Sequence, residues 1–388
     1  MFRIKTYNKI SEVGRHAFDE KYEIDDNFKE YDAIIVHSTP LHDEKFSSDL
    51  KAIVRVGAGT NTIPVEQLTK SGVAVFNTPG GNANAVKELT IAAMICIARN
   101  VLNAEKWVTS LKGEDSEPGK AVEKGKEVFR GPEILGKTIG IIGLGAVGGR
   151  VAKACHDLGM KVKGYDPYLS NQKREDLKQY VSFFDDVNSV YEDSDFISIH
   201  IPFTKSNEKF LNKTSIEKMK KGVYIINYAR GQVVDNDAIL DGLNSGLIKG
   251  FATDFPTKAQ LGHENVFATP HLGAGTPEAD ENCAIMASMQ IREYLENGNI
   301  INSVNFPNIN FDRANGDRIT ILHKNSVGML GQITDIVSSK GLNIENLANK
   351  GRDDIAYTIL DFDTKVDNCI KEEIEKIKDV MYVRILQQ

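Results

Sequence analysis

The stretch IGIIGLGAVG, residues 139–148, reads as an apolar strand that runs directly into the pattern Gly143-x-Gly145-x-x-Gly148. Each glycine has its own physical role. The first permits a tight turn out of the strand, the second lets the backbone approach a pyrophosphate, and the third allows the next helix to pack closely on the sheet. The positive N-terminal end of that helix favours the pyrophosphate charge. The stretch therefore predicts a dinucleotide-binding loop.

An acidic residue ends the next predicted strand. Asp166, in the stretch KGYDP, follows Gly148 by 18 residues. This is near the spacing at which a carboxylate reaches the ribose 2′-hydroxyl and repels the additional phosphate of NADP. Because strand, glycines, helix, second strand and acid occur in order, the sequence predicts an NAD site rather than an ordinary glycine turn.

Length and composition describe a globular protein of several domains. The chain has 388 residues, of which 41% are hydrophobic and 26% charged, and this length exceeds what one core supports. It contains no apolar run of about 18 residues and no signal-peptide pattern, so we expect a cytoplasmic protein without a membrane partner. A net charge of −7 argues against a nucleic-acid partner. The four cysteines form no C-x-x-C pair, so neither a disulfide nor a metal site is expected.

Strand-like segments alternate with helical ones in two series, which predicts an α/β protein. Residues 1–100 predict a flavodoxin-like substrate-binding domain, and residues 101–275 predict a Rossmann-type doubly wound parallel sheet that holds NAD. A long helix is expected from about residue 84 to 111, followed by a charged, solvated stretch at 112–127. Residues 276–306, largely helical, return the chain to the first domain and make that domain discontinuous.

The C-terminal segment predicts a separate small domain. Residues 307–317 predict a linker, and residues 318–388 follow the order βαββαβ of a ferredoxin-like plait. The edge strands of such a unit favour pairing with a second copy. We therefore expect a homodimer or homotetramer.

Two strand ends carry groups suited to chemistry on a hydroxy acid. Arg230, in NYARG, offers a planar fork to a carboxylate at the edge where open α/β sheets bind ligands, although a structural salt bridge would use the same residue type. Histidine as a residue type titrates near neutrality, so His271, in TPHLG, suits proton exchange with a hydroxyl group, although a lone histidine is more often incidental. Beside an NAD site, the pair indicates a dehydrogenase.

Successive blocks of the chain resemble those of the D-isomer-specific 2-hydroxyacid dehydrogenases. In the second domain these blocks are GLGAVG with Asp166, HIP at 200–202, NYARGQVVDNDAI at 227–239, ATDF at 252–255 and TPHLGAGT at 269–276. The first domain adds RVGAGTNTIP at 55–64 and FNTPGGNANAVKEL at 76–89, so the resemblance covers nearly the whole chain. The plait resembles the ACT regulatory domain that many such enzymes carry.

The resemblance implies NAD-dependent oxidation of a phosphorylated 2-hydroxy acid. It implies that Arg230 binds the substrate carboxylate and that His271 takes the C2 hydroxyl proton. The residues that it places around the cofactor are Thr78, Gly143, Gly145, Ala146, Val147, Gly148, Asp166, Ile201, Pro202, Tyr228, Ala229, Arg230, Asp254, His271, Gly273 and Ala274. The residues that it places around the substrate are Arg55, Gly57, Ala58, Gly59, Lys87 and Arg230. Taken singly, Arg55 and Lys87 are equally compatible with solvated surface charges.

The tail also resembles a serine-sensing pattern. The pattern is His323-x-Asn325 followed by Gly341-Leu342-Asn343. It implies L-serine as an effector, with His323, Asn325 and Asn343 as its ligands. One position departs from the pattern, because Val327 stands where the family has a proline, and the loop at 324–328 is less rigid as a result.

A second departure concerns the catalytic histidine. The family has a glutamate that pairs with this histidine, and Ala259 stands at that position here. Without a carboxylate partner His271 is less basic and less firmly oriented. Gln260 and Glu264, from the same loop, are the candidates to replace the glutamate.

Two other functions stay open. One is a dehydrogenase acting on glyoxylate, hydroxypyruvate or D-lactate, against which the ACT-like tail argues because feedback sensing belongs with a biosynthetic branch. The other is a non-catalytic NAD sensor resembling dehydrogenase-fold corepressors. The presence of both Arg230 and His271 disfavours the sensor, whereas Ala259 keeps it open.

Overall fold

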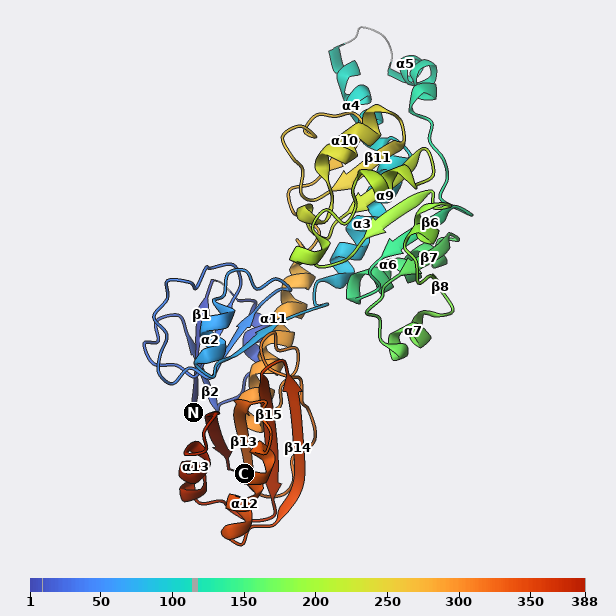
Figure 1. Cartoon of the computed structure of the whole chain (residues 1–388). Coiled ribbons are helices and arrows are strands. Elements are labelled where there is room, and N and C mark those ends of the chain that lie inside the picture. The colour runs from blue at the N-terminus through green and yellow to red at the C-terminus, as the bar shows by residue number, and fades with distance from the viewer. Residues whose placement is uncertain (9, 114–117, 388) are drawn as a thin grey trace. The chain divides into compact units, whose positions relative to one another are not determined.

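The computed structural model describes residues 1–8, 10–113 and 118–387 (Figure 1). Residues 114–117 of the predicted charged stretch lie outside these ranges. The chain divides into two compact units, one made of residues 1–81 and 280–388 and the other of residues 82–279. In the described part of the chain, no helix combines the length and the apolar character needed to cross a bilayer.

The unit of residues 82–279 is built on a seven-stranded, wholly parallel sheet (Figure 1). In spatial order its strands are β12 (Val266–Ala268), β11 (Ile248–Thr253), β10 (Val223–Asn227), β9 (Phe196–Ile199), β6 (Thr138–Ile142), β7 (Lys161–Tyr165) and β8 (Ser182–Phe183). The chain runs outward from β6 to β8 on one side and from β9 to β12 on the other. The junction of β6 and β9 is thus the switch point where doubly wound sheets bind ligands.

Helices cover both faces of this sheet, as the buried, apolar strands require. One face packs against α3 (Ala83–Ala98) and α6 (Ala146–Asp157). The other face packs against α8 (Asn188–Tyr191), α9 (Lys213–Glu217) and α10 (Asn236–Asn244). Short helical segments of this unit include α7 (Asn171–Leu177), η3 (Lys205–Asn207) and η4 (Gly231–Val233).

The predicted long helix is broken in two, so that prediction is wrong at one point. Asn100 has φ = 53°, in the left-handed region, and separates α3 from α4 (Val101–Ser110). Asparagine is one of the few residues that tolerate this conformation. After α4 come η1 (Leu111–Gly113), α5 (Pro118–Gly125) and η2 (Lys126–Phe129). Neither α4 nor α5 buries a side chain.

The first part of the other unit is a five-stranded parallel sheet. Its spatial order is β2 (Tyr22–Asp25), β1 (Phe2–Tyr7), β3 (Ala33–Val36), β4 (Ala52–Arg55) and β5 (Ala74–Asn77), which is the flavodoxin-like order. The sequence did not predict β2, because its alternating charges, YEID, suit an edge strand and resemble a polar loop. Its helices are α1 (Glu12–His16), α2 (Val65–Lys70) and α11 (Pro277–Arg292), and a π-helical turn at Glu293–Asn297 continues α11.

The second part of that unit is the predicted βαββαβ plait. Its elements are β13 (Arg318–Lys324), α12 (Met329–Ser339), β14 (Ile344–Arg352), β15 (Ile355–Phe362), α13 (Asn368–Glu375) and β16 (Val380–Leu386). The antiparallel sheet has the order β14-β15-β13-β16, and α12 and α13 pack on one face. Leu322, Tyr357 and Ile359 on the other face join the core of the five-stranded sheet. The predicted fold class is confirmed.

A buried ion pair joins two strands of the plait. Arg318 and Asp361 are almost inaccessible, with side-chain exposures of 0% and 1%. The guanidinium donates to both carboxylate oxygens, from Nε at 2.5 Å and from Nη2 at 2.9 Å. This bidentate geometry gives the buried arginine a counter-charge within the core.

We expect Asp361→Asn to lower the free energy of unfolding by about 3–5 kcal/mol, because it leaves the buried Arg318 charge uncompensated. Urea unfolding of the full chain, followed by circular dichroism, measures the change. Asp363→Asn, at an exposed position after β15, is the matched control. Equal loss in the two variants would contradict the prediction.

Candidate active site

The glycine loop lies between β6 and α6. Gly143 has φ = 87°, and a Cβ there would lie 2.8 Å from the carbonyl oxygen of His200. A Cβ at Gly148 would lie 1.9 Å from the carbonyl oxygen of Gly143. In contrast, a Cβ at Gly145 would meet nothing within 4 Å, so the backbone is open at the first turn of α6. This opening at a helix N-terminus fits a pyrophosphate, and Ala146 and Val147 begin the helix beside it.

Asp166 follows β7 and is held beside the glycine loop. Its Oδ2 accepts a hydrogen bond from the main-chain N–H of Leu144 at 2.8 Å, and its Oδ1 accepts one from Tyr168 at 3.0 Å. Each carboxylate oxygen keeps a further lone pair. The geometry fits a carboxylate that accepts hydrogen bonds from the hydroxyls of an adenosine ribose.

A neutral histidine lies behind the glycine loop. His200 follows β9, and its Nε2 shares a hydrogen bond with Ser198 Oγ at 2.8 Å. Burial lowers the pKa of His200 to about 4, so the ring is uncharged near neutrality. No role for His200 was predicted from the sequence. The only sequence signal for a role of His200 was its position directly after a buried apolar strand. Ile201 and Pro202, both predicted cofactor contacts, continue the same loop.

The turn after β10 directs Arg230. The amide of the fully buried Asn227 accepts a hydrogen bond from the N–H of Ala229 at 3.1 Å and donates one to the carbonyl of Arg230 at 2.9 Å. The half-buried guanidinium of Arg230 donates to the carbonyl oxygen of Ala229 at 2.7 Å. Among the described residues, no carboxylate lies within salt-bridge distance of it. Its fork is therefore available to a carboxylate ligand.

Asp254, at the end of β11, holds the loop that carries His271. Its carboxylate accepts hydrogen bonds from the N–H of Leu272 at 2.9 Å, from the N–H of Gly273 at 2.6 Å and from the hydroxyl of Thr269. Its carbonyl oxygen accepts the N–H of His271 at 3.2 Å. Asp254 was predicted only as a cofactor contact. In the structure its bonds fix the main chain of the histidine loop.

His271 itself is exposed and has an unusual backbone conformation. Its φ of 55° lies in the left-handed region, which is uncommon for residues other than glycine and concentrates at functional sites. The ring lies 4.8 Å from that of Phe255, centroid to centroid. Within the described ranges, the imidazole has no hydrogen-bond partner. The hydroxyl oxygen of Tyr228 lies 3.3 Å from that of Thr269. Burial raises the pKa of Tyr228.

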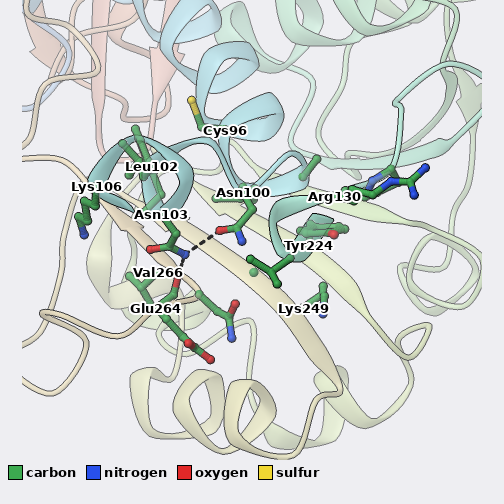
Figure 2. Close-up of a pocket in the computed structure, with 18 residues that line it drawn as sticks. Cys96, Asn100, Leu102, Asn103, Lys106, Arg130, Tyr224, Lys249, Glu264 and Val266 are labelled. Carbon is green, nitrogen blue, oxygen red and sulfur yellow. Dashed lines mark hydrogen bonds between the residues drawn. The ribbon is translucent and has the colours of Figure 1, made fainter. Parts of the chain in front are cut away.

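Neither candidate for the missing glutamate contacts His271. The Gln260 amide is buried, accepts the N–H of Thr257 at 2.9 Å and donates to Asn236 at 3.0 Å. Glu264 precedes β12, whereas His271 follows that strand, so the two lie toward opposite ends of it. Figure 2 shows Glu264 in a groove with Asn103, which donates to its carbonyl at 2.8 Å. Both interpretations are wrong for this structure.

The predicted substrate residues of the other unit come together at the ends of β4 and β5. The Thr78 hydroxyl accepts the N–H of Gly57 at 2.6 Å, and the Thr78 N–H donates to the carbonyl of Gly57 at 3.1 Å. Gly57 has φ = 130°, and a Cβ there would lie 2.5 Å from Nη1 of Arg55. The Nε of Arg55 donates to the carbonyl of His37 at 3.1 Å. Ala58 and Gly59 continue this loop.

Lys87 is placed differently from Arg55. It lies on α3, in the unit of residues 82–279, and its Nζ is 3.4 Å from Oε1 of Glu88. The lysine charge therefore has a partner already. A role in binding substrate stays a prediction for both cations.

The predicted serine ligands differ in accessibility. His323 is buried, with Nδ1 2.8 Å from the carbonyl of Lys324 and Nε2 2.8 Å from Thr358 Oγ1, and burial lowers its pKa. Asn325 and Asn343 are exposed. Serine binding through His323 therefore requires that one of these hydrogen bonds be exchanged. The role of all three residues stays a prediction.

Comparison with known proteins places the chain in a family. Residues 91–273 match the NAD-binding domain of the D-isomer specific 2-hydroxyacid dehydrogenases. A hydroxypyruvate reductase from Thermotoga maritima is 36% identical over 283 residues, which are 69% of this chain and 85% of that protein. The chain belongs to the D-isomer-specific 2-hydroxyacid dehydrogenases. The parallel-sheet unit thus contains the NAD-binding domain of a 2-hydroxyacid dehydrogenase, and NAD is its cofactor.

Other similarities extend to the tail and to solved structures. Residues 319–382 of the chain match an ACT domain like that of the AHAS small subunit. A D-3-phosphoglycerate dehydrogenase from Synechocystis sp. is 36% identical over 80% of the chain, and the chain spans 55% of its length. A structure of NAD⁺-bound 3-phosphoglycerate dehydrogenase from Entamoeba histolytica has a TM-score of 0.61 at 27% identity, covering 78% of this chain and 98% of that one.

The neutral His200 predicts a pH dependence of stability. The unfolded chain takes up this proton near pH 6.5 and the folded protein only near pH 4. The full stability of the folded protein with a neutral His200 is therefore present above pH 6.5. Between pH 6.5 and pH 4 the free energy of unfolding falls by about 2–3 kcal/mol. We expect His200→Asn to remove this fall from urea-unfolding measurements across the window. His156→Asn, at an exposed position, should keep the wild-type slope, and an unchanged slope in His200→Asn would contradict the assignment.

Proposed function

We propose that this 2-hydroxyacid dehydrogenase oxidises 3-phospho-D-glycerate to 3-phosphohydroxypyruvate with NAD, the first step of L-serine biosynthesis. The observation that carries the proposal is the presence of Arg230 and His271 at the carboxyl edge of the NAD-binding sheet, in a chain that also has an ACT-like domain. Relatives named D-3-phosphoglycerate dehydrogenase, at 32–36% identity, support it.

The proposed chemistry uses two side chains. Arg230 binds the substrate carboxylate with its planar fork. His271 takes the proton of the C2 hydroxyl while the C2 hydrogen leaves with its electron pair as hydride, which leaves a 2-oxo acid. Bound NAD supplies the hydride acceptor. The left-handed conformation of His271 and the hydrogen bonds of Asp254 set the position of the general base in this scheme.

The proposal extends to substrate and effector recognition. Arg55, packed against Gly57, and Lys87, which forms an ion pair with Glu88, are the candidates to bind the phosphate. L-Serine is the proposed effector of the ACT-like domain. The exposed Asn325 and Asn343 are its candidate ligands, together with His323 if the ring releases a present partner.

Two alternatives are kept for specific reasons. The Thermotoga relative, named hydroxypyruvate reductase, favours a dehydrogenase for an unphosphorylated 2-hydroxy acid. The lack of a carboxylate partner for His271 among the described residues favours a non-catalytic NAD sensor. The free fork of Arg230 argues against the sensor, since a protein that only senses NAD has no need of a substrate carboxylate ligand.

We further propose a homodimer or homotetramer that works in the cytoplasm. Exposed apolar side chains on α4, namely Val101, Leu102 and Val108, support self-association, because α4 buries no side chain in the single chain. A two-fold axis would let this surface meet its own copy.

The deciding experiment measures NADH oxidation with 3-phosphohydroxypyruvate and, separately, with hydroxypyruvate, each with and without L-serine. We expect kcat/KM to be at least about tenfold higher for the phosphorylated substrate, because an added ion pair with phosphate lowers the barrier by about 1.4 kcal/mol or more. We also expect serine to lower the initial rate. Equal efficiencies would favour the hydroxypyruvate reductase, and no oxidation with either would favour the sensor. An unchanged rate at saturating serine would remove serine as effector.

His271→Gln tests the proposed general base. We expect kcat to fall by about 10²–10⁴-fold, because proton transfer loses its acceptor, while the affinity for NADH measured by fluorescence stays near that of the wild type. His156→Gln is the control, on the exposed side of α6. A kcat within a factor of about three of the wild type in His271→Gln would exclude the role.

A further inference from the structure

A second groove lies in the unit of residues 1–81 and 280–388. It has a volume of about 660 Å³, and its walls come from the edge strand β16, the π-helical turn at Glu293–Asn297, the linker and the start of β1. The charged side chains that line it are Lys21, Lys51, Glu296, Arg313, Lys371 and Arg384. Positive charge thus predominates in a chain whose net charge is −7. None of these residues belongs to the proposed dehydrogenase site.

Arg384, on β16, is a buried cation with neutral partners. Its exposure is 7%. The guanidinium donates to the main-chain carbonyls of Tyr294 at 3.0 Å and Leu295 at 2.7 Å, and it lies 4.9 Å from the centroid of the Tyr294 ring. Carbonyls and a ring orient a guanidinium, but they carry no net charge to neutralise it. The charge of Arg384 therefore acts on the groove.

Arg313, in the linker, has the same kind of surroundings. It donates to the carbonyls of Glu296 at 3.4 Å and Gly316 at 3.3 Å, and to that of Leu386. Its Nε is buried and has no hydrogen-bond partner. Burial and the nearby charge of Arg318 lower the pKa of Arg313.

Nearby carboxylates leave part of this charge uncompensated. Asp317 and Asp361 offset some of it, but Asp361 already binds Arg318 through both oxygens. Glu296, in the groove itself, accepts the hydroxyl of Tyr22 at 2.6 Å and Nε of Arg292 at 3.1 Å.

The lysines at the groove have partners of their own. Lys51 pairs with Asp32 at 2.6 Å, Lys371 with Glu375 at 3.8 Å, and the largely exposed Lys21 with Glu296 at 3.7 Å. The excess positive charge therefore resides on the two arginines. Lys21 is free to swing toward a stronger anion, because its present pair is long and its side chain is 62% exposed.

We propose that this groove binds a small oxyanion, a metabolite that carries a phosphate or carboxylate group. The planar fork of a guanidinium matches an oxyanion, and the volume lies in the range of small-molecule sites, about 300–1,000 Å³. The ligand would contact Arg384 of the plait, Arg313 of the linker and Lys21 of the first domain. Its binding therefore stabilises the attachment of the ACT-like domain to the five-stranded domain.

The test uses the full chain and two probes, inorganic phosphate and succinate, titrated by calorimetry and by thermal unfolding at an ionic strength held constant with sodium chloride. We expect saturable binding of at least one probe and a rise in Tm. Stronger binding of phosphate points to a phosphorylated metabolite, and stronger binding of succinate to a carboxylate. Arg313→Gln and Lys21→Gln should each weaken binding about fivefold or more, which corresponds to about 1 kcal/mol.

Two controls locate the binding. Lys29→Gln, at an exposed position of the same unit, and Arg230→Gln, in the proposed substrate site, should both leave it unchanged. Because Lys21 is exposed, Lys21→Gln keeps the test valid even if Arg313→Gln folds poorly. The proposal is overturned if neither probe binds, if binding disappears in Arg230→Gln, or if Lys21→Gln binds as the wild type does. A rise in Tm that sodium chloride alone reproduces overturns it as well.

Discussion

In a parallel sheet every strand ends at the same edge, and this constraint brings together the residues of the proposed dehydrogenase site. The glycine loop follows β6, Asp166 follows β7, Arg230 follows β10 and His271 follows β12. Each of them begins within three positions of the last residue of its strand. The arrangement of these residues thus depends on the common direction of the strands. The central strands β9 and β10 are buried on both faces, as is typical of parallel sheets that helices cover on both sides.

The same constraint explains what the sequence could predict. Buried strands and glycine spacing are local patterns, so the fold class and the strand ends were predictable from residues alone. Loop hydrogen bonding is not periodic. Gln260 and Glu264 lie close to Ala259 in sequence, yet the Gln260 amide binds Thr257 and Asn236, and Glu264 lies before β12. Residue spacing does not predict the partners of Gln260 or the position of Glu264, because both depend on how other segments of the chain pack against the loop.

A carboxylate partner would give a catalytic histidine both an orientation and a counter-charge. In this chain the backbone supplies the orientation. Asp254 binds the N–H groups of Leu272 and Gly273, and these bonds hold His271 in its left-handed conformation beside Phe255. No side chain in the described part of the structure supplies the counter-charge. The exposed ring is instead in contact with solvent.

The plait contains one buried arginine whose charge is neutralised within the protein. Arg318 receives a bidentate carboxylate from the neighbouring strand, and its charge is neutralised inside the core. Arg313 and Arg384 lie near it, but their hydrogen bonds go to carbonyl oxygens. Arg384 is buried and Arg313 is partly buried, and a cation that is held in the interior without a full counter-charge is destabilising. The destabilisation is offset when an anion from solution enters the groove, which is why the contrast among the three arginines points to a ligand.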